Sequence, residues 1–332
     1  MPGTLIPVQE TVAGASRVTV LAASTRQKST DASEMFGAGR AEGLSYATVE
    51  VSIPPDIQRK VGQVQRPATP PGNPQREFVT LSRDYLDRQA FVSALTRMAK
   101  ESKRTKVVVF VHGFNNRFDD AVYRLAQIVH DSNVAVIPVL FTWPSRGEVA
   151  LRAYTYDRES ANYSRDAFGD VLDLLNQNPA ITEVNILAHS MGNWIVLEAL
   201  RTRALRAKRG PDKIKNAMLV APDVDVDVFQ QQLRTIGTSP RLELFVSRDD
   251  KALGLSGFIW GGVPRVGEVD PDQEPYRTEF QRARIEVFDL SDLNARSAHS
   301  KAFENAGSVA AMLRQRLRDG QQMTETASAI VP

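Results

Sequence analysis

Buried apolar runs alternate with helical segments through most of the chain. The run 107–111 is continuously apolar and ends at His112-Gly113, as expected for a strand that is buried on both faces. Residues 118–130 follow with apolar side chains three and four positions apart, and the runs 134–141 and 184–188 begin further repeats of this pattern. Because parallel strands need helical crossovers, the alternation predicts an α/β fold with a mainly parallel central sheet covered by helices on both faces.

The same patterns assign the other elements. Strands are expected at 17–22, 46–53, 107–111, 134–141, 184–188, 217–220, 242–246 and 285–288, and helices at 118–130, 160–175, 192–205, 226–233, 251–255 and 302–317. Two insertions interrupt the alternation, an aromatic one at 143–163 and a Gly- and Pro-rich one at 254–276. Ligands of open α/β sheets bind at the carboxyl ends of the strands, so both insertions are candidate walls of a pocket.

The expected domain organisation is a single elaborated α/β unit. Residues 54–74 contain six of the eighteen prolines and are expected to form a long irregular loop. We expect the N-terminal strands and this loop, residues 1–80, to pack on the catalytic core at 81–320 as part of the same domain. The polar residues 321–332 are expected to form a flexible tail.

Composition and charge exclude several functional classes. The 332 residues are 42% hydrophobic and 24% charged, which is typical of a globular protein. The formal net charge is +2, and no block of Lys and Arg indicates a nucleic-acid-binding surface. No apolar run approaches the ~18 residues of a membrane span. The absence of cysteine excludes disulfides, thiolate metal sites and a cysteine nucleophile.

Neither the compartment nor the oligomeric state follows from these residues. The first ten residues lack the basic and apolar regions of a signal peptide. A secreted or periplasmic protein whose signal has been removed would have the same N-terminus, so the localisation stays open.

The segment with the clearest chemical signal is Ala188-His189-Ser190-Met191-Gly192. It follows a predicted strand directly and leads directly into a predicted helix, which is the context of a nucleophile elbow. The residues two before and two after the serine must be small so that strand and helix can pass each other, and here they are Ala188 and Gly192. The sequence therefore predicts that Ser190 is a nucleophile.

A serine hydroxyl needs a base to take its proton and an acid to orient that base. In this fold the acid and the histidine follow the serine along the chain. His299 is the single histidine after Ser190 and lies between the last predicted strand and the last predicted helix, so it is the expected base. Asp250 is the preferred acid because it follows a predicted strand. Asp223 is the main alternative, with Asp249 and Asp225 behind it.

Two backbone amides are expected to form the oxyanion hole. Met191 follows the nucleophile, and Phe114 lies in the loop after the strand 107–111, where esterases carry the second donor. His112 precedes the serine and is expected to order this loop rather than to act as the base. From the two insertions we expect the aromatic side chains of Trp143, Tyr156 and Trp260 to bind substrate.

Taken together, these motifs resemble the α/β-hydrolase superfamily, and within it a bacterial branch of α/β hydrolases of unknown function (domain of unknown function 900). The resemblance rests on six blocks in the expected order, at 110–115, 141–145, 156–164, 188–193, 221–225 and 250–253, with His299 beyond them. Residues 52–55 resemble the branch more weakly. The resemblance implies an esterase- or lipase-like serine hydrolase and supports Ser190, Asp250 and His299 as its triad.

The expected activity is hydrolysis of small-molecule carboxylic esters through an acyl-enzyme on Ser190, without a cofactor. Thioesterases and amidases share this chemistry and are not separated from esterases by these residues. A non-catalytic binding protein with an α/β-hydrolase fold is the alternative from another functional class. No metal site is expected, because the four histidines show no spacing typical of metal ligands.

Overall fold

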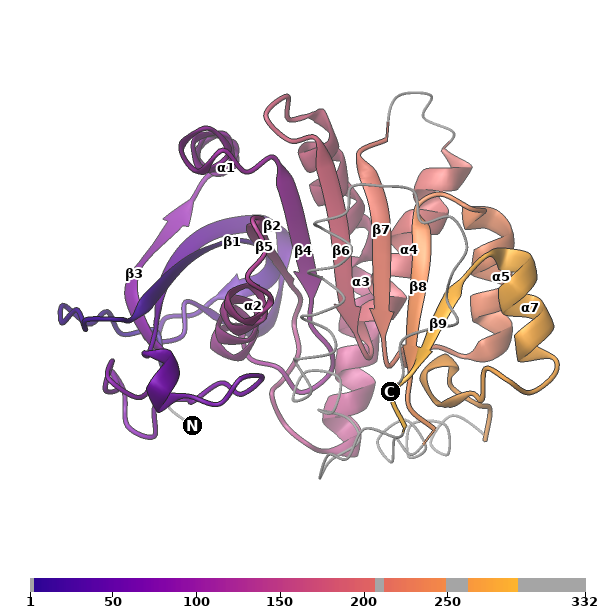
Figure 1. Cartoon of the computed structure of the whole chain (residues 1–332), viewed down its shortest axis with the longest axis horizontal. Helices are drawn as coiled ribbons and strands as arrows, with labels where there is room; N and C mark the ends of the chain where they lie inside the picture. The colour runs from indigo at the N-terminus through magenta and orange to yellow at the C-terminus, as the bar shows by residue number, and fades with distance from the viewer. Residues whose placement is uncertain (1–2, 207–211, 249–261, 292–332) are drawn as a thin grey trace.

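The protein, seen in a computed structural model that describes residues 3–206, 212–248 and 262–291, is built around one mixed β-sheet (Figure 1). The described strands lie in the order β3-β2-β1-β5-β4-β6-β7-β8-β9. Their bounds are β1 (Ser16–Lys28), β2 (Phe36–Ile53), β3 (Val79–Leu86), β4 (Lys106–Val111), β5 (Ile137–Thr142), β6 (Glu183–His189), β7 (Ile214–Val220), β8 (Arg241–Val246) and β9 (Glu286–Asp289). Strands from β1 through β5 to β9 run parallel, whereas β2 and β3 add an antiparallel edge.

Helices cover both faces of this sheet. The described helices are α1 (Arg88–Ser102), α2 (Phe118–Ser132), α3 (Leu151–Gln177), α4 (Gly192–Leu205), α5 (Val226–Ile236) and α7 (Tyr276–Ala283), with short 3-10 turns at η1 (Asp56–Gln58) and η2 (Val266–Glu268). In Figure 1, α2 lies in front of the sheet and α3 behind it. Successive side chains of β4 point to opposite faces of the sheet. Val107 and Val109 pack in the core that includes α3, and Val108 and Phe110 pack in the core that includes α2. Each face of β4 is therefore buried, as its continuous apolar sequence predicts.

The mainly parallel α/β architecture predicted from the sequence is confirmed, but several elements differ from their predicted bounds. The helix expected from residue 160 starts at Leu151, so much of the aromatic insertion 143–163 is the first half of α3. The buried side of this half includes the polar residues Asp157 and Ser164, which hide its apolar periodicity. The structure also adds β3, α1 and α7, which the patterns did not predict.

Two predicted helices, at 251–255 and 302–317, lie outside the described residues, as does the tail expected at 321–332. Among the described helices, none combines the length and the apolar character needed to cross a bilayer.

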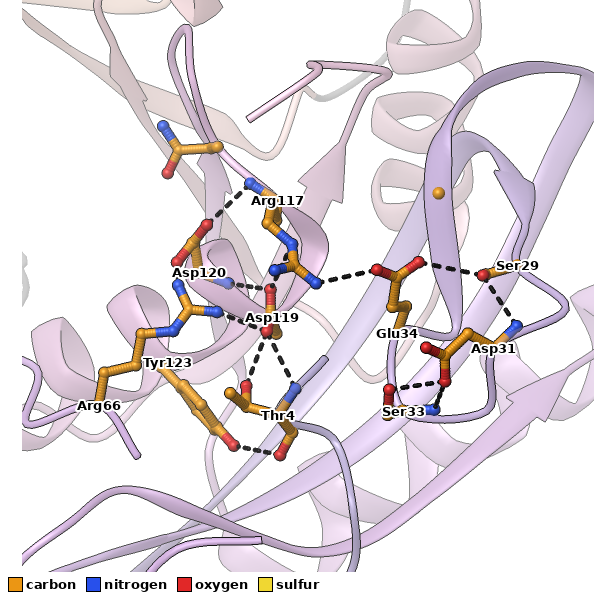
Figure 2. A network of polar contacts seen from close by, with 12 residues as sticks. Thr4, Ser29, Asp31, Ser33, Glu34, Arg66, Arg117, Asp119, Asp120 and Tyr123 are labelled. Carbon is orange, nitrogen blue, oxygen red and sulfur yellow. Dashed lines mark hydrogen bonds and ion pairs between the residues drawn. The ribbon is translucent and has the colours of Figure 1, made fainter. Parts of the chain in front are cut away.

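The N-terminal segment is fastened to the start of α2 by a buried carboxylate (Figure 2). Asp119 Oδ2 accepts hydrogen bonds from the backbone N–H of Thr4 at 3.2 Å and from its hydroxyl at 2.7 Å. The same oxygen lies 2.5 Å from Nη2 of Arg66, which belongs to the proline-rich loop. Beside it, Arg117 pairs with Glu34 at 3.0 Å. This network joins three distant segments of the chain at the helix that follows the 112–117 loop.

We expect Asp119→Ala to lower the free energy of unfolding by about 3 kcal/mol, because the Arg66 charge and the Thr4 donors lose their buried acceptor. Asp119 is 1% exposed, whereas Asp84 on β3 is exposed and serves as the control. Urea denaturation of both alanine variants measures the difference. Equal stability of the two variants would contradict the structural role of this network.

Candidate active site

Ser190 occupies the tight turn between β6 and α4. Its φ is +49°, in the left-handed region that costs a residue with a side chain of order 1–3 kcal/mol. Hydrogen bonds hold this conformation from both sides. The Ser190 N–H donates to the Val220 carbonyl at 2.9 Å, and the Ser190 carbonyl accepts from the side-chain amide of Asn193 at 2.9 Å. The backbone geometry is that of a nucleophile elbow.

Two glycines allow the elbow to pack against the loop that follows β4. A Cβ atom on Gly192 would lie 2.7 Å from the Val111 carbonyl oxygen and closer still to that of His112. A Cβ atom on Gly113 would lie 2.8 Å from Ser190 Cβ. Neither position has room for a side chain, which brings the 112–114 backbone directly against Ser190.

The predicted oxyanion donors lie on the two sides of this contact. Met191 caps α4, where the helix dipole favours negative charge, and Phe114 follows Gly113 in the loop. Within the described part of the chain, the backbone N–H groups of Met191 and Phe114 have no hydrogen-bond partner. Neither amide is therefore used by the described part of the fold, and the oxyanion role of both stays a prediction.

His112 anchors the 112–117 loop through hydrogen bonds of its imidazole ring. It is completely buried, and its Nε2 accepts hydrogen bonds from the Thr142 hydroxyl at 2.9 Å and from the Trp143 N–H at 3.2 Å. The proton must therefore sit on Nδ1, which donates to the Gly113 carbonyl at 2.9 Å. Burial, together with the nearby charge of Arg26, holds the pKa of His112 well below its usual value. His112 is a neutral residue that orders the loop, as the sequence predicts.

Trp143 and Tyr156, two of the predicted substrate-binding residues, have other contacts in the structure. Trp143 has no exposed surface; its indole N–H donates to the His112 carbonyl at 2.8 Å and its ring stacks on the imidazole. Tyr156 is half-buried and donates to the Ala38 carbonyl on β2 at 3.0 Å. Substrate contact by either residue stays a prediction, and Trp260 lies outside the described residues.

Tyr154 is the aromatic side chain of α3 that reaches the elbow, and the sequence did not single it out. Its ring packs edge-on against Phe114, with centroids 5.3 Å apart. Its hydroxyl donates to Asp223 Oδ2 at 2.5 Å, and the Asp223 N–H donates to the Ser190 carbonyl at 3.3 Å. Tyr154 lies three and seven positions before the buried residues Asp157 and Ala161, a helical spacing that could have placed it on the inner face of α3.

The two alternative triad acids within the described residues differ in their surroundings. Asp223 is 2% exposed and faces the buried Arg265, whose Nε lies 3.5 Å from Oδ1. Asp225 caps α5 by accepting from the N–H groups of Asp227 and Val228. Asp223 therefore lies at the elbow, whereas Asp225 has the capping role that aspartate often takes at a helix start.

The preferred acid and base, Asp250 and His299, lie outside the described residues, as does Asp249. The chain approaches them from the same edge of the sheet as Ser190, because β6, β8 and β9 are parallel and end there. Arg248 is the last described residue after β8, and Ser291 is the last described residue after β9. The Arg248 N–H donates to the Ser291 hydroxyl at 2.8 Å. The last described residues before Asp250 and His299 are thus in contact, and the roles of both side chains stay predictions.

The described residues contain no group of three or more His, Asp or Glu side chains that could hold a metal ion. His130, for example, is on the far end of α2 and pairs with Asp56 at 3.2 Å.

Comparison with solved structures finds proteins of similar architecture at low sequence identity. An esterase from Pyrococcus furiosus is 12% identical over 64% of this chain and 84% of its own, with a TM-score of 0.35. A predicted CIB-like hydrolase from Thermoplasma acidophilum is 14% identical over 71% of this chain and 91% of its own, with a TM-score of 0.39. Naproxen esterase from Bacillus subtilis is 11% identical over 70% of this chain and 98% of its own, with a TM-score of 0.32.

No curated protein matches the chain. The sequence profile of a protein family does match it, from residue 87 to residue 316, which is more than half of the 332 residues. That span contains the elbow, the 112–117 loop and every predicted triad residue. The protein belongs to the family of α/β hydrolases of unknown function (DUF900).

Proposed function

We propose that the protein is a serine hydrolase that cleaves carboxylic esters through an acyl-enzyme on Ser190. The observation that carries this proposal is the left-handed Ser190, with φ of +49°, packed against the loop that contains Phe114. Among the described residues, the N–H groups of Phe114 and Met191 have no hydrogen-bond partner. A strained serine next to two free donors is the arrangement that acyl transfer requires.

In the proposed reaction, His299 takes the proton of Ser190 as Oγ attacks the ester carbonyl. The carbonyl oxygen becomes an oxyanion, which the N–H groups of Phe114 and Met191 stabilise. His299 then protonates the leaving alcohol, and the acyl group stays on Ser190. Water, activated by the same histidine, releases the acid and restores the hydroxyl. Asp250 orients the imidazole throughout.

The surroundings of the elbow favour uncharged acyl or aryl groups. The rings of Phe114 and Tyr154 pack edge-on against each other, and Phe114 directly follows Gly113, which lies against Ser190. A purely structural protein would gain nothing from a left-handed serine, whose conformation costs free energy. A thioester or amide in place of the ester would pass through the same intermediate and differ in its leaving group.

Replacement of Ser190 by alanine is expected to lower kcat/KM for p-nitrophenyl butyrate by at least about 10³-fold, because the nucleophile is lost. Ser132→Ala removes another buried hydroxyl, at the far end of α2, and should leave the rate unchanged. Spectrophotometric assays of the purified full chain measure both. Retention of activity by the Ser190 variant would refute the proposed nucleophile.

The triad assignment predicts a graded series. His299→Gln should abolish turnover, and Asp250→Asn should lower kcat by about 10²- to 10⁴-fold, because the imidazole loses its orienting acid. Asp223→Asn should cost less than tenfold, and His130→Gln, on α2, should cost nothing. Steady-state kinetics with thermal unfolding as a check on folding distinguishes the variants. A larger loss for Asp223→Asn than for Asp250→Asn would transfer the acid role to Asp223.

A further inference from the structure

A buried arginine of the N-terminal β-extension reaches the loop that carries Phe114. Arg26 lies on β1 where the pairing with β2 is interrupted by bulges, two residues after Ser24, which pairs with the last residue of β5. Its side chain is 1% exposed and thus enclosed at the carboxyl edge of the parallel strands. Burying a guanidinium costs free energy unless its N–H groups find hydrogen-bond acceptors.

Among the residues that the structure describes, the hydrogen-bond acceptors of this guanidinium all belong to neutral groups. Nε donates to the Thr142 hydroxyl at 2.9 Å, and Nη2 donates to the Asn116 carbonyl at 2.6 Å and to His112 Nε2 at 3.4 Å. Nη1 donates to the carbonyls of Ser145 at 2.9 Å and Gly37 at 3.1 Å. Burial lowers the pKa of Arg26 to about 10, which leaves the group charged at neutral pH. Its planar fork joins the loop after β4 to the loop after β5 in a fixed geometry.

A carboxylate on α3 also contacts the loops that follow β4 and β5. Asp157 on α3 has no exposed surface and accepts from the Ser145 hydroxyl at 2.5 Å and the Arg146 N–H at 2.9 Å. The Ser145 oxygen in turn accepts from the Asn116 N–H at 3.0 Å. Burial raises the pKa of Asp157, against the effect of these hydrogen bonds and of the Arg26 charge. The loops are therefore clamped between a buried cation and a buried acid.

The donors from Arg26 onward form a chain with one consistent direction. Arg26 Nε–H donates to Thr142 Oγ, and the Thr142 hydroxyl donates to His112 Nε2. His112 Nδ1–H then donates to the Gly113 carbonyl. That carbonyl and the Phe114 N–H belong to one planar peptide group, on opposite sides of the bond. A hydrogen bond to the carbonyl fixes the plane of this group and makes its N–H a stronger donor.

We propose that Arg26 and Thr142 are positioning residues of the oxyanion hole, acting through His112 and the Gly113–Phe114 peptide group and never touching the substrate. This role rests on the proposed hydrolase function and deepens it. It also assigns a purpose to the β1–β2 extension, which lies outside the span of the family match. The extension supplies the charge at the start of the chain of donors.

The decisive variant is Thr142→Val, which keeps the shape of a buried side chain and removes the hydroxyl that bridges Arg26 Nε and His112 Nε2. The longer direct contact between Arg26 Nη2 and His112 Nε2, at 3.4 Å, remains in this variant. We expect kcat to fall about 10- to 100-fold while KM changes less than threefold, since a displaced or weakened donor affects the transition state most. Thr142→Ser retains the hydroxyl and should restore kcat to within threefold of the wild type. Arg26→Lys keeps the charge without the fork and should resemble Thr142→Val.

Two matched controls separate positioning from a general loss of stability. Thr80→Val removes a fully buried hydroxyl of β3 that bonds to Tyr123. Arg59→Lys alters a buried arginine that pairs with Asp131 at 2.5 Å, near the end of α2. Both controls should lower the unfolding temperature and leave kcat within twofold of the wild type. An equal fall of kcat in the controls would overturn the proposal.

The remaining outcomes are also distinguishable. An active wild type whose Thr142→Val and Arg26→Lys variants fold and keep kcat within twofold would overturn the positioning role alone. Failure of Thr142→Ser to recover kcat would do the same. If the wild type neither hydrolyses p-nitrophenyl esters nor reacts with a fluorophosphonate, the proposed hydrolase function falls first. If Arg26→Lys fails to fold, the comparison of Thr142→Val with Thr142→Ser tests the positioning role without it.

Discussion

The contact between the elbow and the loop after β4 is the constraint on which the rest of the site depends. β4 and β6 are adjacent parallel strands, so the segments that leave them must pass each other at the same edge of the sheet. They do so with no space for a Cβ atom at Gly192 or Gly113. This close crossing packs the 112–114 backbone against Ser190, which has a left-handed conformation. Any larger residue at either glycine would force the loop and the turn at Ser190 apart.

Buried polar groups then set the exact course of the loop. Apolar packing alone would leave the peptide planes of 112–117 free to adopt several orientations, whereas directional hydrogen bonds select one. His112 fixes the Gly113 carbonyl, Asp157 fixes the following turn, and Arg26 ties both to the N-terminal extension. Buried charges of this kind are by themselves weak evidence for stability.

The sequence predicted what depends on apolar periodicity and local motifs. The run 107–111, the elbow at Ser190 and the helix at 192–205 have the bounds that the pattern gives to within a residue or two. The start of α3, whose buried face carries polar groups, was misplaced, whereas α1 was missed although its buried residues are apolar. The first half of α3 buries Asp157 and Ser164, and its Tyr154 looked like one aromatic residue among several. Arg26 carried no signal, because an arginine in a strand is normally exposed and only the tertiary structure brings it to His112.

Reaction of the folded wild type with one equivalent of a fluorophosphonate, followed by mass spectrometry of its proteolytic peptides, tests the central claim most directly. The reagent forms a stable bond only to a serine activated as a nucleophile. The elbow geometry predicts one adduct per chain, on the peptide and the residue of Ser190, and none after denaturation. An adduct on another serine, or an unlabelled protein with Ser190 intact, would contradict the account.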